Sequence, residues 1–311
     1  MAPKVSIIIA SHRPALISGL LDGILRQQFD GVYEILVVTD YSPEELKKKY
    51  PRAQWHYLEN RSISAKRNLG VSKSIGEITA FIDDDCVPMT DWLQNGTLYL
   101  DEHKETAAVE GLTTIEETGL LTGTHREYRR LEKPGYRTNN IFYRKKVFLD
   151  AGGFDERFTV QREDVDLAFS VIKTGGKIDY NPGIRVEHRF RHWEKWDLLK
   201  NCWNRRFDPL LFRKHPELYR KHIRSPFPPA IAGLLCSYFL CLSLFPVRSL
   251  SRWAASLVLA LILGLGIKRT GFKKVNPERF LFDTISVALA PLVLTAALVY
   301  GGIRFRKLLI Y

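Results

Sequence analysis

The sequence predicts an α/β fold with a mostly parallel, doubly wound sheet, followed by an apolar region that contains transmembrane helices. Three observations predict this fold. Strand-like apolar runs alternate with helix-like segments over the first 100 residues, acidic residues directly follow two of those runs, and long charge-free runs occupy the last 87 residues. Strand–helix alternation favours a parallel sheet with helices on both faces. The chain of 311 residues is long enough for one large domain or two ordinary ones.

The first run, 5–10, is apolar apart from one serine and reads as a buried strand. The next segment, 16–28, repeats leucine and isoleucine at helical spacing. Gly76 follows a predicted helix as a residue favoured just past a helix end. In chain order, the expected elements are strand 5–10, helix 16–28, strand 34–38, helix 43–50, strand 55–58, helix 62–74 and strand 78–82.

Acidic residues stand where two of these strands end. Asp40 follows the second strand, and Asp83, Asp84 and Asp85 follow the fourth. Ligands of open α/β sheets bind beyond the carboxyl ends of the strands. Three adjacent buried carboxylates repel one another, and a hard divalent cation with oxygen ligands relieves that cost. A solvated turn or helix N-cap with Asp84 exposed is the alternative reading, and strand alternation places Asp83 and Asp85 on one face.

Two further segments carry charged residues of interest. Glu163 to Asp166 opens a predicted helix that continues to Ile172. Its acids suit the first turn of a helix by the helix dipole, and next to a metal site one of them becomes a candidate general base. Lys66 and Arg67 precede the acidic strand, where a basic helix face either meets phosphate or is simply solvated.

Taken in order, several short motifs resemble those of family 2 glycosyltransferases, which have a GT-A fold and transfer sugar from nucleoside-diphosphate donors. The resemblance covers residues 4–190. Each tract is weak alone, whereas the ordered set is specific. The tracts are Ser-His-Arg-Pro at 11–14, Gln-Gln at 27–28, Val-Val-Thr-Asp at 37–40, Ala-Lys-Arg-Asn-Leu-Gly at 65–70, Gly76, Phe-Ile-Asp-Asp-Asp at 81–85, Thr-Asn-Asn at 138–140, Gly-Gly-Phe-Asp at 152–155 and Glu-Asp at 163–164.

The resemblance implies a role for each matching residue on the donor side. Asp40 matches a residue that recognises the nucleoside base, and Arg67 matches a basic donor-side position. Asp83 and Asp85 match the outer members of a D-x-D motif, in which the first reaches the ribose or sugar and the last holds Mg²⁺ or Mn²⁺ on the diphosphate. His188 stands where many relatives place a histidine that contacts the metal or diphosphate, and a surface histidine is the alternative.

On the acceptor side, Asp164 matches the base that deprotonates the acceptor hydroxyl, with Glu163 beside it. Asn139 or Asn140 matches an asparagine that lines the site, and Asn140 is our choice. The chain departs from the family pattern at Thr39, where a second acid is common, and at His12, where asparagine is common.

Charge and cysteine content narrow the class of protein. The net charge is +12, and residues 225–311 supply +8 of it with ten basic and two acidic residues. Basic residues between apolar runs usually face lipid headgroups, so we expect a lipid bilayer as partner and no nucleic acid. None of the four cysteines forms a CxxC pair, which indicates neither a disulfide framework nor a zinc site.

The C-terminal part predicts two or three membrane crossings. Residues 225–247 give 23 charge-free residues and 284–303 give 20, whereas 253–267 give only 15, which suits a buried helix or half-hairpin. Three crossings would leave the basic tail around Arg304 outside, against the positive-inside rule. Two crossings plus an interfacial or re-entrant segment relieve that conflict. The expected domains are 1–192 for the GT-A domain, 193–224 for juxtamembrane interfacial helices and 225–311 for the membrane domain.

Residues 193–224 combine aromatic and basic side chains, which suits the headgroup layer. Trp203 in this segment lies where some membrane relatives carry an acceptor-side tryptophan motif, and interfacial helices are the favoured reading. Five basic residues between 213 and 224 precede the first apolar run, so the catalytic domain is expected on the cytoplasmic side of an integral membrane protein.

The resulting hypothesis is an inverting, metal-dependent glycosyltransferase that uses a nucleoside-diphosphate sugar. Its expected acceptor is a polyprenyl phosphate, a lipid-linked glycan or a growing cell-envelope polysaccharide. A metal-dependent phosphohydrolase would use similar carboxylates but needs further His/Asp ligands. A catalytically silent membrane scaffold would not need carboxylates at each of these positions.

Overall fold

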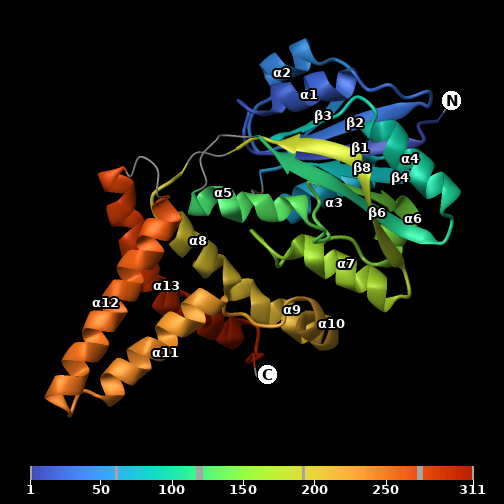
Figure 1. The fold of residues 1–311 in the computed structure, drawn as a ribbon. Helices are drawn as coiled ribbons and strands as arrows, with labels where there is room; N and C mark the ends of the chain where they lie inside the picture. Colours follow the sequence, from blue (N-terminus) through green and yellow to red (C-terminus); the bar gives the residue numbers. More distant parts are fainter. Residues whose placement is uncertain (1, 60–61, 117–121, 191–192, 272–275, 310–311) are drawn as a thin grey trace. The chain divides into compact units, whose positions relative to one another are not determined.

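The computed structural model describes residues 2–59, 62–116, 122–190, 193–271 and 276–309 (Figure 1). The chain forms two compact units. The sheet unit contains residues 1–117 and 129–190, and the helical unit contains residues 118–128 and 191–311. The domain boundary expected after residue 192 falls at residues 191–192, outside the described residues. The grouping of 118–128 with the C-terminal part is a feature that the sequence did not indicate.

Among the described residues, the sheet unit holds one eight-stranded sheet, in the order β3-β2-β1-β4-β7-β6-β8-β5. The first four of these strands are parallel to one another, and helices connect them along the chain. This half confirms the expected alternation, with element bounds shifted by a few residues. Its elements are β1 (Val5–Ser11), α1 (Ile17–Leu25), β2 (Tyr33–Thr39), α2 (Glu44–Lys49), β3 (Ala53–Tyr57), α3 (Ile63–Lys73) and β4 (Ile78–Ile82).

The second half of the sheet is mixed. Strand β7 (Asn140–Arg144) runs antiparallel to both β4 and β6 (Thr106–Ile115), and β6 runs parallel to β8 (Lys177–His188). The short strand β5 (Cys86–Pro88) pairs antiparallel with the end of β8, so that Cys86 stands opposite His188. This pairing brings two sequence-distant regions to the end of β4.

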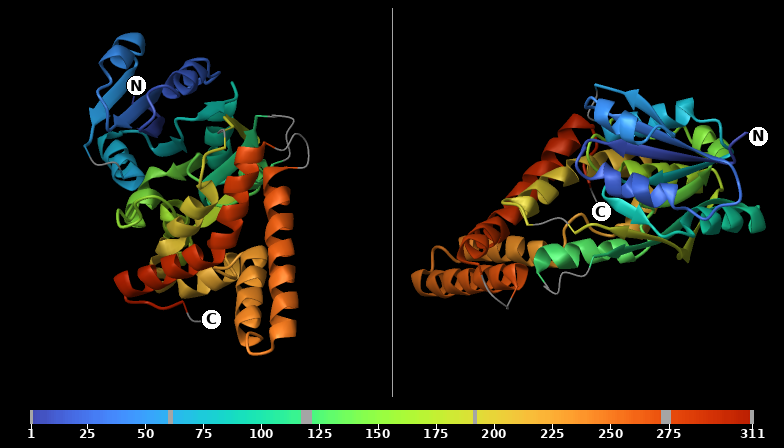
Figure 2. Two further views of the ribbon diagram at one scale, coloured as in Figure 1. Left: turned by 90° about the vertical axis from the view of Figure 1, so that its left-hand side faces the viewer. Right: turned by 90° about the horizontal axis from the view of Figure 1, so that it is seen from above.

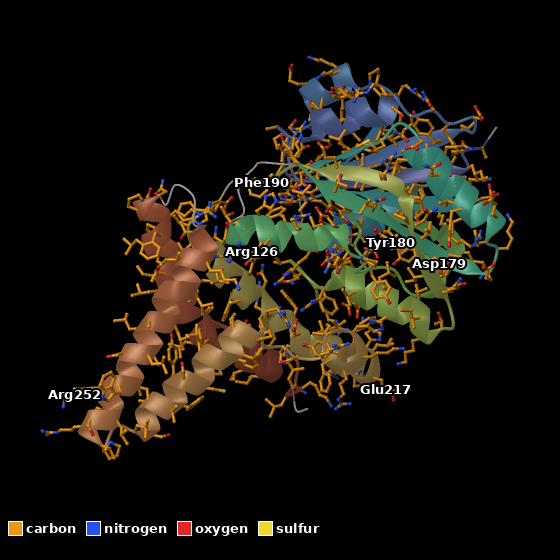
Figure 3. All side chains as sticks on the ribbon, in the orientation of Figure 1. Arg126, Asp179, Tyr180, Phe190, Glu217 and Arg252 are labelled. Atoms are coloured by element: carbon orange, nitrogen blue, oxygen red, sulfur yellow. The ribbon has the colours of Figure 1, made fainter. Side chains whose placement is uncertain are left out.

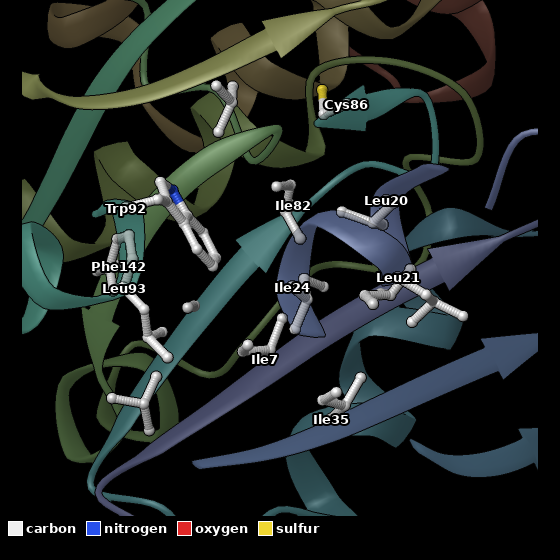
Figure 4. Packing of buried hydrophobic residues seen from close by; sticks show 14 of the residues in the cluster. Ile7, Leu20, Leu21, Ile24, Ile35, Ile82, Cys86, Trp92, Leu93 and Phe142 are labelled. Atoms are coloured by element: carbon white, nitrogen blue, oxygen red, sulfur yellow. The ribbon is translucent and has the colours of Figure 1, made fainter. Parts of the chain in front are cut away.

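Helices cover both faces of the sheet and enclose two cores. Leu20 and Ile24 of α1 pack in one core with Trp92 of α4 (Trp92–Glu102), as Figure 4 shows. The other core joins residues of α3, α6 (Lys145–Asp150) and α7 (Glu163–Lys173), including Phe148 and Leu167. The doubly wound arrangement expected from the sequence is therefore confirmed.

Helix α3 lies very close to β1. Ser62 caps the helix by accepting a hydrogen bond from the Ala65 amide. A Cβ atom at Gly70 would lie 2.7 Å from Cγ2 of Ile8, so only glycine permits this approach. The close approach buries Lys66 and Arg67 one turn earlier, at 1% and 3% exposure.

The helical unit contains α5 (Gly123–Tyr128) and a series of helices after residue 193. Two helices, α12 and α13, are long and apolar enough to cross a membrane by length and composition, and α11 is a shorter apolar helix. The first predicted span, 225–247, is therefore helical only over α11. The segment 253–267, which is short for a span, is part of the longer helix α12. The helices are α8 (Asp197–Asn204), α9 (Asp208–Lys214), α10 (Pro216–His222), α11 (Pro229–Ser243), α12 (Arg248–Thr270) and α13 (Pro277–Arg304).

Asn140 is a polar link inside the sheet unit. Its Nδ2 donates to the carbonyls of Leu112 and Ile184, each at 3.0 Å, and its Oδ1 accepts from Nε1 of Trp92 at 2.8 Å. Both Asn140 and Trp92 are fully buried. The side chain therefore joins β7, β6, β8 and α4, and it stands opposite Ile82 at the end of β4.

Replacing Asn140 by alanine is expected to destabilise the protein by about 3–5 kcal/mol, because it leaves several buried polar groups without partners. Thermal unfolding of the purified chain in detergent should show a melting temperature lower by on the order of 10 °C. Asn95→Ala, which removes one hydrogen bond to the Gly183 carbonyl near the surface, is the control and should shift it much less. Equal shifts for the two variants would contradict the structural role of Asn140.

Candidate active site

The carboxyl ends of β1, β2 and β4 meet at one edge of the sheet, because β1 lies between the other two and all three are parallel. Asp40 follows β2, and Asp83, Asp84 and Asp85 follow β4. The acids singled out in the sequence thus lie on either side of the end of β1. Because carboxylates this close together repel one another, nearby cations are needed to stabilise their ionised forms.

Asp84 is the buried anchor of this edge, at 1% exposure. Its Oδ2 accepts hydrogen bonds from Ser11 Oγ at 2.9 Å and from the amides of His12 and Arg13, each at 3.2 Å. Its Oδ1 accepts from Nε of Arg13 at 2.9 Å. Asp84 therefore fastens the turn after β1 to the end of β4, and the reading of an exposed Asp84 is wrong.

Arg13 is a site residue that the sequence analysis missed. Its Nη1 lies 2.5 Å from Oδ2 of Asp85, while its other nitrogens bind Asp84. Burial opposes the charge of Arg13, but the carboxylates of Asp85 and Asp84 outweigh it and raise the pKa of the guanidinium. The only sequence signal was its place in the Ser-His-Arg-Pro tract after β1.

Asp85 also meets His188, across the β5–β8 pairing. Nε2 of His188 lies 3.4 Å from Oδ1 of Asp85, and both residues are mostly buried. Ligand atoms of Asp85, Cys86 and His188 all lie within 4.8 Å of one another. Burial raises the pKa of the Cys86 thiol well above its usual range, so the thiol stays neutral. An oxygen and an imidazole nitrogen fit Mn²⁺ or Mg²⁺ at Asp85 and His188, with Cys86 as a packing residue.

Arg67 connects the acidic triplet to the start of α7. Its Nη2 lies 2.7 Å from Oδ1 of Asp83, and its Nη1 lies 3.0 Å from Oε1 of Glu163. The guanidinium also lies over the ring of Phe154, 5.5 Å from its centroid. Arg67 therefore bridges two carboxylates that are 80 residues apart in the chain.

The acid pair Glu163 and Asp164 begins α7, after Arg162 in a left-handed conformation with φ of 81°. Burial, and then the charge of Asp164, raises the pKa of Glu163 to about 7. Burial also raises the pKa of Asp164, although its Oδ1 accepts a hydrogen bond from the Val165 amide at 2.7 Å. Oε2 of Glu163 is buried, and no described residue forms a hydrogen bond with it. A carboxyl pair with raised pKa values suits proton transfer near neutral pH.

Lys66 and Asp40 form a further ion pair, with 3.0 Å between Nζ of Lys66 and Oδ2 of Asp40. The same Nζ donates to the Ser11 carbonyl at 2.9 Å. Lys66 is almost fully buried, and the solvated helix face considered in the sequence is therefore absent at Lys66 and Arg67. Lys66 therefore holds Asp40 at the end of β2. The sequence had indicated only that Lys66 lies on a basic helix face.

The structure brings most of the sequence-predicted residues to this edge. The contacts above link seven of them to this edge: Asp40, Arg67, Asp83, Asp85, Glu163, Asp164 and His188. Asn140 stands beside the end of β4, but all of its side-chain bonds go to the fold. Trp203 belongs to the helical unit, where its ring packs 5.4 Å from that of Tyr300.

Comparisons with known proteins point in one direction. A family model described as "Glycosyl transferase family 2" matches residues 6–158, and one described as "Glycosyl transferase family group 2" matches residues 88–268, more than half of the chain. The chain is 24% identical to the glucosyl-dolichyl phosphate glucuronosyltransferase of Haloferax volcanii, over 64% of this chain and 74% of that protein. It is 26% identical to the pre-mycofactocin glycosyltransferase of Mycobacterium tuberculosis, over 69% of this chain.

A solved structure, GalNAc-T7 with UDP, GalNAc and Mn²⁺, matches 70% of this chain with a TM-score of 0.51 and 14% identity. This likeness concerns the fold. The chain spans about half the length of that structure and 46% of the mycobacterial relative.

The carboxyl of Glu163 should make stability depend on pH. With a folded-state pKa of about 7 and an ordinary value of about 4.3, Glu163 releases a proton on unfolding between these values, so stability falls as pH rises through the window. Glu163→Gln removes this loss. Its melting temperature relative to the unaltered chain should therefore rise between about pH 5 and about pH 8.

Glu102→Gln, an exposed change at the end of α4, is the matched control and should show a difference that does not vary with pH. A constant offset for Glu163→Gln as well would mean that Glu163 is ionised throughout this range.

Proposed function

The chain belongs to the family 2 glycosyltransferases, and from this premise we propose that it is an inverting, metal-dependent enzyme. It transfers a sugar from a nucleoside-diphosphate sugar to a hydroxyl or phosphate of a lipid-linked or cell-surface acceptor. The observation that carries the proposal is the bridge by Arg67 between Asp83, at the end of β4, and Glu163, next to Asp164. That bridge joins a donor-side carboxylate to an acid pair suited to proton transfer.

On the donor side, the proposed residues are Asp40, Arg67, Asp83 and Asp85. Asp40 would accept hydrogen bonds from the nucleoside base, and Asp83 from hydroxyls of the ribose or sugar. Asp85 and His188 would hold Mg²⁺ or Mn²⁺, which supplies neutralisation of the diphosphate leaving group. Support comes from the similar fold of a protein solved with UDP and Mn²⁺. Arg67 and Arg13 keep the carboxylates oriented between them.

On the acceptor side, Asp164 would accept the proton from the attacking hydroxyl. Burial raises its pKa, which brings the carboxylate closer in proton affinity to the group it must deprotonate. Glu163 would hold Arg67 and line the site, and Asn140 would keep the end of β4 in place. Trp203 remains a proposal for the acceptor side.

For the acceptor, we propose a polyprenyl phosphate or a lipid-linked glycan, with a role in building cell-envelope polysaccharide. The archaeal relative is named for action on a glucosyl-dolichyl phosphate. Two apolar helices and the aromatic, basic segment before α11 would keep the enzyme at a bilayer. The basic residues before the first apolar helix favour a cytoplasmic catalytic domain, where nucleotide sugars are made.

Incubating membranes that contain the protein with a panel of radiolabelled nucleotide sugars tests the proposal. We expect label to move from one donor into a lipid-extractable or polymeric product. Label released only as free sugar or sugar phosphate would instead indicate a hydrolase. No turnover of any donor, with the protein folded and metal supplied, would indicate a silent scaffold.

Asp164→Asn keeps the size of the side chain and removes its ability to accept a proton. We expect turnover to fall by roughly 10²–10⁴ with donor affinity nearly unchanged. Single-turnover kinetics and calorimetric titration with the donor measure the two quantities. Asp150→Asn, an exposed change on α6, is the control and should leave both unchanged. A collapse of donor affinity in Asp164→Asn would move Asp164 to the donor site and leave Asp166 as the next candidate base.

Metal removal should abolish transfer. With excess EDTA we expect no turnover, and addition of Mn²⁺ or Mg²⁺ should restore it, because Asp85 and His188 are proposed to hold the cation. Asp85→Ala and His188→Ala should each raise the metal concentration needed for half-maximal activity. Cys86→Ala is the control, since the neutral thiol is not proposed as a ligand. Full turnover in EDTA would rule out the metal site.

A further inference from the structure

Both ends of α13 rest on one short segment of the chain, residues 193–214. At the start of the helix, Trp193 donates from Nε1 to Oδ1 of Asp283 at 3.2 Å, and the rings of Trp196 and Phe282 are 4.9 Å apart. Lys195 pairs with Glu278 at 2.5 Å. The first turns of α13 therefore contact residues 193–196.

The other end of α13 contacts residues 203–213 of the same segment. A Cβ atom at Gly301 would lie 2.0 Å from the Arg206 carbonyl oxygen, so the helix backbone touches this segment directly. Arg213 donates from Nη1 to the Phe305 carbonyl at 2.9 Å and so caps the C-terminal end of α13. Lys307 lies over the ring of Phe212, 5.6 Å from its centroid.

The contacted segment cannot cross a hydrocarbon layer. It has no long apolar run, and it carries nine charged residues: Glu194, Lys195, Asp197, Lys200, Arg205, Arg206, Asp208, Arg213 and Lys214. Each charged residue placed at the centre of a bilayer opposes insertion strongly. If α13 crossed the bilayer, its two ends would lie on opposite faces, and this segment would have to cross beside it. The length and composition of α13 alone point to a span, whereas its packing opposes one.

The outward face of α13 is apolar along the whole helix. Between its charged ends at Glu278 and Arg304, its exposed large apolar residues follow helical spacing: Leu281, Ile285, Leu289, Leu292, Val299 and Ile303. Trp196 and Trp203, on the segment beneath, are each more than a third exposed. Apolar side chains flanked by tryptophans and basic residues are typical of the boundary between headgroups and acyl chains.

We propose that α13 and residues 193–214 form an interfacial platform that lies on one face of the lipid bilayer, and that the hairpin of α11 and α12 is the membrane-crossing element. The platform and the residues on both sides of the hairpin then share one face. This inference rests on the helical unit alone and holds whichever sugar the enzyme transfers.

Helix α12 has the features of a membrane-crossing helix, and the shorter apolar helix α11 is its partner in the hairpin. Helices α11 and α12 pack side by side, and their connection lies far from α13 (Figures 1 and 2). Helix α12 is mostly exposed, since only 6% of its most apolar 18-residue stretch is buried. Its start carries Arg248, Arg252 and Trp253, and Figure 3 shows Arg252 at the tip of the hairpin. From Arg248 to Lys268 the helix spans about 30 Å, the thickness of the hydrocarbon core.

This arrangement removes the charge conflict of a three-span topology. Only Arg248 and Arg252 lie at the hairpin tip, whereas Lys268, Arg269 and Arg279 lie at its base. The basic tail around Arg304 returns to the platform face. The larger basic charge thus gathers on one side, as the positive-inside rule favours.

Labelling of single cysteines in sealed membranes with an impermeant maleimide tests the proposal. The background carries Cys236→Ala and Cys241→Ala and keeps the buried Cys86 and Cys202. Glu217→Cys reports the platform face, Ser249→Cys the hairpin tip and Lys307→Cys the tail; all three positions are exposed. We expect Glu217→Cys and Lys307→Cys to react from the same side, and Ser249→Cys only from the opposite side.

Every other pattern overturns the proposal. Lys307→Cys reacting from the side opposite Glu217→Cys would mean that α13 crosses the bilayer. Ser249→Cys reacting from the same side as Glu217→Cys, or from neither side, would mean that the hairpin does not cross. The background chain must remain unlabelled, and all three variants must react in detergent, which shows that each thiol is available.

A second measurement needs no substitution. An epitope tag placed after Tyr311 should be cut by protease from the same side of sealed vesicles as the chain between α10 and α11, and cutting from opposite sides would contradict the platform. Neither assay uses a sugar donor, so its failure is distinct from a failure of the proposed transfer reaction.

Discussion

Charge balance at one edge of the sheet is the constraint on which the site depends. Six carboxylates gather around the ends of β2 and β4 and the start of α7, and they would repel one another in a buried setting. Arg67 lies among them with 3% exposure and binds Asp83 and Glu163. Arg13 binds Asp84 and Asp85, and Lys66 binds Asp40. Removing one partner of such a buried pair leaves an uncompensated charge, which costs far more than an exposed ion pair contributes. The close contact of α3 with β1, permitted by Gly70, is what delivers two of the three cations.

The same network divides the acidic triplet into different tasks. Asp84 accepts five hydrogen bonds from the chain itself and has no capacity left for a ligand, so it serves the fold. Asp83 and Asp85 each bind one guanidinium and keep oxygen atoms for other partners. Glu163 and Asp164 differ in a similar way, since Glu163 binds Arg67 whereas Asp164 bonds the backbone of its own helix. Adjacent residues of one type thus differ in chemistry because their neighbours differ.

The parallel half of the sheet was predictable from the sequence because each strand there is a short apolar run followed by a turn and a helix of regular spacing. The carboxylates were predictable because they follow such runs directly. Arg13 was not, since its partners lie about 70 residues away and a lone arginine after a strand has no local signature. The full length of α12 was also missed. Its first five residues include Arg248 and Arg252, which look like a break in an apolar run but are tolerated in a helix whose end is exposed. The pairing of β5 with β8, which brings His188 to Asp85, depends on contacts between strands about 100 residues apart.

The short helix α5 has a practical consequence for protein production. The chain leaves the sheet unit at residue 118, forms α5 within the helical unit, and returns at residue 129. There Glu127 pairs with Arg269 at 2.5 Å, and Thr124 accepts a hydrogen bond from Arg279 at 3.2 Å. A stop codon after residue 190 would therefore leave α5 without these partners and expose the surface of α5 that contacts them. A recombinant sheet unit calls for a second edit, in which a short glycine–serine bridge replaces residues 118–128.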